Sequence, residues 1–148
     1  MISTLVKNPT TILRPEPVLV NVRGRLLYLP NDDGLTPTIS KGDYEPFETE
    51  LIVKCLRFGD TMIDVGANIG YFTVIGAKFC DPGKVIAIEP DPYSIYLLKR
   101  NLEVNRIDNV EIHEFAAGSV EGEANLHLAP MTANGRKCLW NHGDNRLW

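Results

Sequence analysis

The sequence has no long apolar run, which excludes a membrane-spanning helix. No stretch approaches the roughly 18 to 20 apolar residues that a span requires, and residues 1–11 lack the charged-then-apolar layout of a signal peptide. Cysteine is also scarce. Cys55, Cys80 and Cys138 form an odd and scattered set, which argues against a disulfide framework. We therefore expect a cytoplasmic protein with no membrane partner.

Positive charge is in deficit as well. Fifteen Lys and Arg residues stand against nineteen Asp and Glu residues, which gives a formal net charge of −4. Because contact with a phosphate backbone needs a positive field, this balance predicts that nucleic acid is not a partner. No metal site is predicted either, because the ligand-like spacing of Cys138 and His142 has no second pair to complete it.

The composition itself is that of a globular protein of about one domain. The chain has 148 residues, 44% of them hydrophobic and 23% charged, with no repeat or low-complexity tract. Residues 18–22 and 25–29 have the pattern of two short strands around Gly24, and Pro46 suits the first turn of a following helix. We expect this helix to pack on a sheet through Phe47, Leu51, Ile52, Cys55 and Phe58.

From Gly59 onward, strands and helices alternate. The predicted elements, in order, are a strand at 61–65, a helix at 70–79, a strand at 85–88, a helix at 92–105 and a strand at 110–115. Two successive right-handed βαβ units place the second strand between the first and the third. The predicted fold class is α/β, a Rossmann-like three-layer sandwich.

After residue 115 the helical period disappears. Alternation at Ala124, Leu126 and Leu128 and a turn at Asn134-Gly135 favour a β-hairpin from Ala124 to Trp140. The sequence therefore divides into a β lead-in at 1–43, a Rossmann-like core at 44–123, and a hairpin with a tail at 124–148.

The most informative segment runs from Asp64 to Gly70, where a buried strand ends and a helix begins. Open α/β sheets bind ligands at this place. Gly66 and Gly70 allow a tight turn and close helix packing, but Asn68 stands where a dinucleotide-binding loop has its second glycine. The loop therefore favours a nucleoside ligand without phosphates over NAD, and an NAD-binding module remains the less favoured alternative.

Glu89 follows the next strand, nineteen residues beyond Gly70, where an acidic side chain can accept hydrogen bonds from both hydroxyls of a ribose. Asp64 has a carboxylate at the helix N-terminus, suited either to an ammonium group or to the amides of the loop. After the third strand, Phe115-Ala116-Ala117 offers an apolar wall for an adenine ring. These groups together predict an adenosine-containing ligand.

With these residues the chain resembles the FkbM-type S-adenosylmethionine-dependent methyltransferases of class I fold, from about Val18 to Leu139. The resemblance rests on Tyr44-Glu45-Pro46, the loop from Asp64 to Tyr71, Glu89-Pro90 and Ala116-x-Gly118. It implies S-adenosyl-L-methionine as the cofactor and O-methylation of a sugar or natural-product hydroxyl. The cofactor-binding residues it implies are Asp64, Gly66, Ala67, Asn68, Gly70, Tyr71, Glu89, Pro90 and Ala116, together with Tyr44 and Glu45.

The chain also departs from that family, because no fourth strand with a Lys-(Ile/Leu)-Asp-x-Glu-Gly segment follows. The resemblance therefore implies a fold that is incomplete in its C-terminal half, and we name no catalytic residue. The strand at 61–65 is expected to be an unprotected sheet edge, open to self-association or to a partner chain. The acceptor is expected to be a small molecule or glycan. The alternative is a non-catalytic cofactor-binding remnant or half-domain that needs a partner chain.

Overall fold

The computed structural model describes residues 16–31 and 34–126, together with the backbone of 3–6, 127, 132–133, 136–137 and 146–147. The elements up to the last helix are β1 (Ser3–Val6), β2 (Val18–Val22), β3 (Arg25–Leu29), α1 (Leu35–Ser40), α2 (Pro46–Cys55), β4 (Thr61–Val65), α3 (Tyr71–Cys80), β5 (Lys84–Ile88) and α4 (Pro92–Val104). They are followed by β6 (Val110–His113), β7 (Ala116–Ala117), β8 (Gly122–Ala124), β9 (Leu126–His127), β10 (Thr132–Ala133), β11 (Arg136–Lys137) and β12 (Arg146–Leu147).

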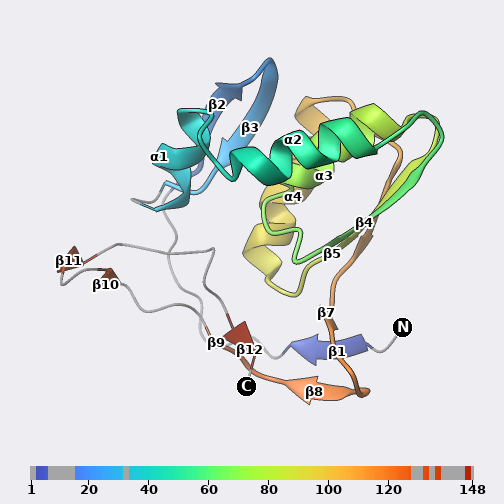
Figure 1. The fold of residues 1–148 in the computed structure, drawn as a ribbon. Coiled ribbons are helices and arrows are strands. Elements are labelled where there is room, and N and C mark those ends of the chain that lie inside the picture. Colours follow the sequence, from blue (N-terminus) through green and yellow to red (C-terminus); the bar gives the residue numbers. More distant parts are fainter. Residues whose placement is uncertain are drawn as a thin grey trace.

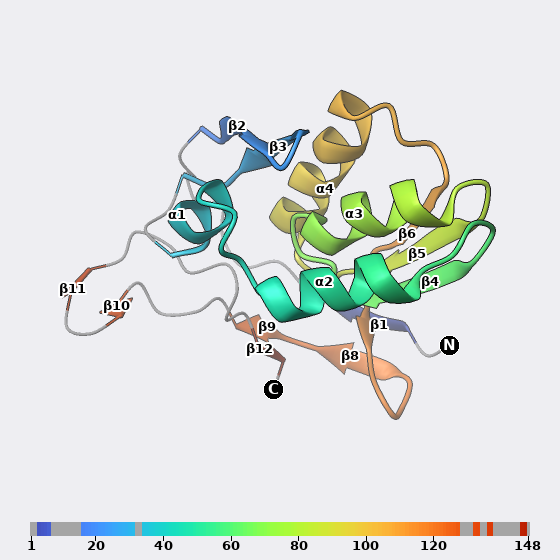
Figure 2. The same cartoon turned by 45° about the horizontal axis from the view of Figure 1, so that its top comes forward.

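The central sheet is parallel and has the order β4-β5-β6 (Figure 1), so the predicted position of the second strand is confirmed. Both crossovers move in the same direction across the sheet, so right-handed connections place α3 and α4 on the same face. Figure 2 shows α2, α3 and α4 side by side on that face. The described residues therefore supply a helical layer on one face of this sheet only.

The two crossover helices match their sequence signals closely. Asp91 is the N-cap of α4 and its side chain accepts a hydrogen bond from the backbone amide of Tyr93, as its place before Pro92 predicts. The helix buries Leu97, Leu98 and other residues of one stripe. By contrast, α3 is buried on most of its surface because it lies between the sheet, α2 and α4.

The N-terminal lead-in contains the predicted hairpin. β2 and β3 pair antiparallel around Arg23 and Gly24, whose φ angles of 52° and 79° suit a two-residue hairpin turn. β3 lies against α4, and its inward side chains Leu27 and Leu29 join the main core. The lead-in therefore shares a hydrophobic core with the Rossmann-like part of the chain.

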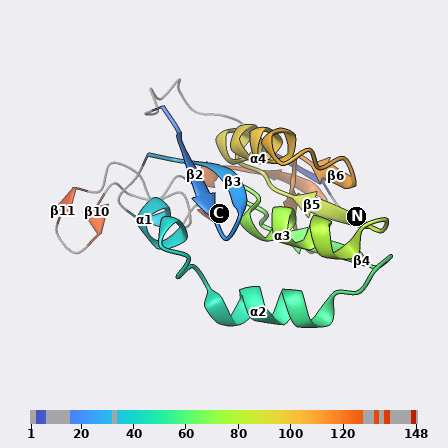
Figure 3. The ribbon, with the colours of Figure 1, turned by 90° about the horizontal axis from the view of Figure 1, so that it is seen from above.

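Helix α2 differs from its prediction. Seen from above in Figure 3, it lies at the outer side of α3, and it contacts α3 rather than the sheet. Phe47 and Leu51 of the helix are exposed by 73% and 49%, whereas Thr49 is buried. Phe58, which lies in the turn beyond the last helical residue Cys55, is exposed by 83%. The prediction that this apolar side packs on a sheet is wrong, because α3 already occupies the sheet face.

In the C-terminal part, β10 and β11 pair antiparallel on either side of the predicted turn, and β9 pairs antiparallel with β12. β8 pairs with β1, which also pairs with β7, so this segment joins the N-terminal strand. The residues Asn134-Gly135, Cys138, Trp140 and His142 lie outside the described residues.

The described residues contain neither a candidate membrane-spanning helix nor a candidate metal-binding cluster. None of the helices in this part of the chain is both long and apolar enough to cross a bilayer. No group of three His, Cys, Asp or Glu side chains within it is arranged to hold a metal ion.

Candidate functional site

The loop between β4 and α3 has a strongly constrained backbone. Gly66, Asn68 and Gly70 have φ angles of 80°, 51° and 85°, a region that favours glycine and tolerates asparagine. The amides of Gly66 and Ala67 donate to the Ile88 carbonyl at the end of β5, at 2.9 and 3.1 Å. The loop is therefore attached to the carboxyl end of the neighbouring strand.

The two glycines of this loop serve different purposes. A Cβ at Gly66 meets nothing within 4 Å, whereas a Cβ at Gly70 collides with Leu98 of α4. Gly70 thus permits the close approach of α3 and α4, and Gly66 leaves the loop surface open. The sequence predicted both a tight turn and close helix packing, and the structure assigns the packing to Gly70.

Glu89 is the central polar residue of the site. Its side chain is buried, with 7% exposure, and each carboxylate oxygen accepts one backbone amide at 2.8 Å. One amide belongs to Asn68 in the glycine loop and the other to Asp91 at the start of α4. Glu89 therefore connects the ends of β4 and β5.

Burial raises the pKa of Glu89 above its usual value, and the nearby negative charges of Asp91 and Asp64 raise it further. The two amide hydrogen bonds oppose this effect because they favour the ionised form. One lone pair on each carboxylate oxygen is left over after these two bonds.

Ser94 extends this polar group. Its hydroxyl lies 3.1 Å from Asn68 Oδ1 and 3.0 Å from Asp91 Oδ2, close enough to donate its single hydrogen to either oxygen. Sequence reasoning missed Ser94. The available signal was its position three residues after the N-cap Asp91, which places it on the same side of the first helical turn.

Asp64 points toward α3. Its Oδ2 accepts a hydrogen bond of 2.5 Å from the hydroxyl of the buried Thr73, and burial raises the pKa of the Asp64 carboxyl. The hydroxyl and backbone amide of Thr73 oppose that rise. Of the two roles predicted for Asp64, organising the loop amides belongs instead to Glu89, which binds the amide of Asn68.

An aromatic cluster lies beside Asp64. The ring of Tyr44 is 5.1 Å from that of Tyr71 and 6.0 Å from that of Phe72. Burial, followed by the charges of Glu45, Tyr71 and Asp64, raises the pKa of Tyr44 to about 12. Tyr44 and Asp64 therefore lie near enough to interact electrostatically, and Tyr44 stays a neutral phenol at physiological pH.

The other predicted site residues lie as follows. Glu45 is exposed at the N-cap of α2 with φ 39°, and its side chain makes no capping hydrogen bond. Ala67 is buried in the loop, and Pro90 is half-buried beside Glu89. Ala116 is buried in β7, where it pairs with Thr4 of β1. The structure thus groups the loop with Glu89, and Asp64 with Tyr44.

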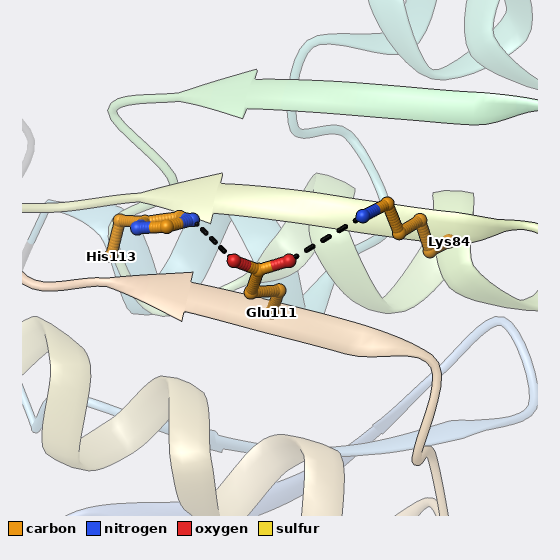
Figure 4. A network of polar contacts seen from close by, with 3 residues as sticks. All are labelled: Lys84, Glu111 and His113. Atoms are coloured by element: carbon orange, nitrogen blue, oxygen red, sulfur yellow. Dashed lines mark hydrogen bonds and ion pairs between the residues drawn. The ribbon is translucent and has the colours of Figure 1, made fainter. Parts of the chain in front are cut away.

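A second polar group lies on the sheet face opposite the helices. Figure 4 shows Glu111 between Lys84 and His113, with distances of 3.5 Å to Lys84 Nζ and 2.9 Å to His113 Nε2. The Glu111 side chain is 53% exposed. It therefore provides a solvent-accessible counterpart to the buried Glu89.

Comparison with known proteins places this site in a family. The profile of the TRM5/TYW2 methyltransferase domain matches residues 42–127, more than half of the chain, including the glycine loop and Glu89. Ribosomal protein L11 methyltransferase of Acetivibrio thermocellus is 32% identical over 85 residues, which are 57% of this chain and 27% of that protein.

Two further comparisons come from Methanocaldococcus jannaschii. Its tRNA(Phe) (4-demethylwyosine(37)-C(7)) aminocarboxypropyltransferase is 39% identical over 51 residues, 34% of this chain and 20% of that protein. The crystal structure of its TYW2 in complex with AdoMet aligns with a TM-score of 0.55 and 24% identity, over 73% of this chain and 47% of that one. The chain thus spans 27% and 20% of the lengths of the two curated relatives named here.

These findings confirm the class I methyltransferase fold and, at the level of the family, the S-adenosylmethionine cofactor. The family matched is TRM5/TYW2, so the FkbM resemblance identified the fold and cofactor class but not the family.

The predicted partners need correction. The prediction that nucleic acid is not a partner is contradicted, because one relative is named for its action on tRNA(Phe). The expected small-molecule or glycan acceptor is contradicted by the same comparisons, whose names specify tRNA and a ribosomal protein. A net charge of −4 is the sum over this chain, and it does not describe the charge of a local surface.

Proposed function

We propose, because the chain belongs to the TRM5/TYW2 methyltransferase domain family, that it binds S-adenosylmethionine and forms part of an enzyme that modifies RNA. The observation that carries the proposal is the family match over residues 42–127, which contains every predicted cofactor residue. The relatives named above do not support sugar or natural-product O-methylation, the finer activity expected from the sequence.

In the proposed cofactor site, different side chains bind the ribose and the methionine portion. Glu89 would accept the ribose hydroxyls through the lone pairs that its two amide bonds leave over. Asp64 and the face of Tyr44 would attract the positively charged methionine portion. Gly66 has open space around it, which suits close approach of a ligand to the backbone. We also propose, as the sequence predicts, that Ala67, Asn68, Gly70, Tyr71, Pro90 and Ala116, together with Glu45, contribute to cofactor binding.

The chemistry demands little of these residues beyond positioning. The sulfonium of S-adenosylmethionine already activates the group to be transferred, so the protein mainly holds donor and acceptor in line, which is worth roughly 7 to 11 kcal/mol of barrier. We assign no general base among the described residues. The alternative is a non-catalytic cofactor-binding half-domain that needs a partner chain.

Cofactor binding is tested by calorimetric titration of the chain with S-adenosylhomocysteine, S-adenosylmethionine and NAD. We expect binding of the two adenosyl ligands and none of NAD. Glu89→Gln should weaken S-adenosylhomocysteine binding by about tenfold or more, because charge-assisted bonds to the ribose are lost. Glu111→Gln is the matched control on the neighbouring strand and should bind normally. A folded chain that binds neither adenosyl ligand contradicts the proposal.

The acceptor class is tested with two labelled forms of S-adenosylmethionine, incubated with total RNA and total protein. Methyl transfer carries a label from the methyl group into RNA, whereas aminocarboxypropyl transfer carries a label from the carboxyl group. Label that nuclease treatment releases supports an RNA acceptor. Label retained in protein contradicts it, and cofactor binding without any transfer indicates the half-domain.

A further inference from the structure

Two asparagines of α4 bind the free edge of the N-terminal hairpin in the same way. Asn101 Oδ1 accepts the Tyr28 amide at 2.5 Å and Asn101 Nδ2 donates to the Tyr28 carbonyl at 3.1 Å. Asn105, one helical turn later, accepts the Leu26 amide at 3.2 Å and donates to the Leu26 carbonyl at 2.6 Å. Side-chain amides thus pair with the edge of β3 that faces away from β2.

The third hydrogen bond distinguishes the two residues. The remaining hydrogen of Asn105 Nδ2 goes to the Asn101 carbonyl within α4, at 2.8 Å. The remaining hydrogen of Asn101 Nδ2 goes to the carbonyl of Ile69, also at 2.8 Å. Ile69 belongs to the glycine loop, so Asn101 alone of this pair connects the hairpin to the candidate cofactor site.

The loop is thereby held from two sides over two consecutive residues. Glu89 binds the amide of Asn68, and Asn101 binds the carbonyl of Ile69. Asn101 is fully buried, so water cannot replace a lost partner there. The segment between these bonds includes the positive φ of Asn68 and precedes that of Gly70.

We propose that Asn101 is a positioning residue of the cofactor site, which holds the Ile69 carbonyl of the glycine loop and couples docking of the β2–β3 hairpin to cofactor binding. This inference rests on the proposed binding of S-adenosylmethionine at that loop. Coupling is reciprocal: if the docked hairpin favours the binding-competent loop, the bound cofactor strengthens hairpin docking by the same factor. The N-terminal lead-in is then part of the cofactor-binding unit, and the predicted division at residue 43 does not separate two functions.

The variants Asn101→Ala and Asn105→Ala form a matched pair, because each loses the same two bonds to β3. Calorimetric titration with S-adenosylhomocysteine is carried out at a temperature where circular dichroism shows both variants fully folded. Asn101→Ala should weaken binding by about fivefold to tenfold, the change expected for one buried hydrogen bond, and Asn105→Ala by less than about twofold. Equal effects of the two substitutions, or no effect of the first, overturn the inference.

A measurement on the unaltered chain tests the same coupling if Asn101→Ala does not fold. Hydrogen exchange of the Tyr28 and Leu26 amides is compared with and without saturating S-adenosylhomocysteine. The Tyr28 amide, which is bonded to Asn101, should gain more protection than the Leu26 amide, which is bonded to Asn105. Equal or absent gains overturn the inference. Failure of the unaltered chain to bind the ligand is a different result, and it overturns the proposed function as well.

Discussion

The region around α3, α4 and the glycine loop contrasts with the outer side of α2, the turn that follows α2, and the outer face of β4. Both regions are rich in apolar residues, but Leu97 and Leu98 are fully buried, whereas Phe58 is 83% exposed and Ile63 and Val65 are each 61% exposed. Met62, which alternates with Ile63 on β4, packs against the α3 core. The difference shows that an apolar pattern specifies a surface to be covered, and that only the neighbouring elements decide whether it is covered.

The packed region should be strongly destabilised by a side chain at Gly70. Gly70→Ala adds a Cβ that collides with Leu98 and places a side chain at φ 85°, so we expect a loss of about 2–4 kcal/mol in the free energy of unfolding. Gly66→Ala has a similar φ but open space, so backbone strain alone should cost about 1 kcal/mol. Chemical denaturation of both variants measures the difference. Equal losses would show that the contact with Leu98 has no energetic weight.

Within the packed region, the buried hydroxyl of Thr73 should matter next. Thr73→Val keeps the shape of the side chain but removes the donor to Asp64, which should cost about 1–3 kcal/mol at neutral pH. Thr49 is also buried, but its hydroxyl contacts lie at 3.4 Å, so Thr49→Val should cost less than about 1 kcal/mol. Urea unfolding of the pair decides the order. A larger loss for Thr49→Val contradicts it.

The pH dependence of stability should reveal the buried charge of Asp64. Burial raises its folded pKa, so the proton is bound more tightly in the folded state, and the associated stability is lost as pH rises through the folded pKa. Asp64→Asn removes this titration. The free energy of unfolding of Asp64→Asn minus that of the unaltered chain should therefore increase with pH. The increase should begin near the ordinary aspartate pKa and level off at pH values above the raised pKa of folded Asp64. A difference that stays constant with pH would show that Asp64 is not desolvated.

The exposed region should respond least. Phe58→Ser should change the free energy of unfolding by less than about 0.5 kcal/mol, because the ring is already in solvent. Leu97→Ala, at a fully buried position of α4, should cost about 2–5 kcal/mol under the same conditions. Thermal unfolding monitored by circular dichroism compares them. A large loss for Phe58→Ser would mean that its surface is covered in this chain.

Much of the fold follows from local patterns. The elements and their parallel order were predicted from short signals: Gly66 and Gly70, the N-cap Asp91 before Pro92, and the apolar runs at 61–65 and 85–88. These signals are readable because turn chemistry and hydrophobic period act within a few residues. The exposed side of α2 was mispredicted for the opposite reason. The period of Phe47, Leu51 and Phe58 indicates a helical face but contains nothing about which element lies opposite.

By itself, the sequence determined the glycine loop, the acidic residue after the second parallel strand and the adenosyl class of ligand, since each depends on residue types at short spacings. The tertiary structure alone decided which polar atoms meet. Asp64 binds Thr73, Glu89 binds the amides of Asn68 and Asp91, and Asn101 joins Tyr28 to Ile69. The bond from Asn101 to Ile69 spans 32 positions and that to Tyr28 spans 73, so no local pattern encodes them. They form because these groups are shielded from water, so a polar atom left unpaired there would lose free energy that solvent cannot restore.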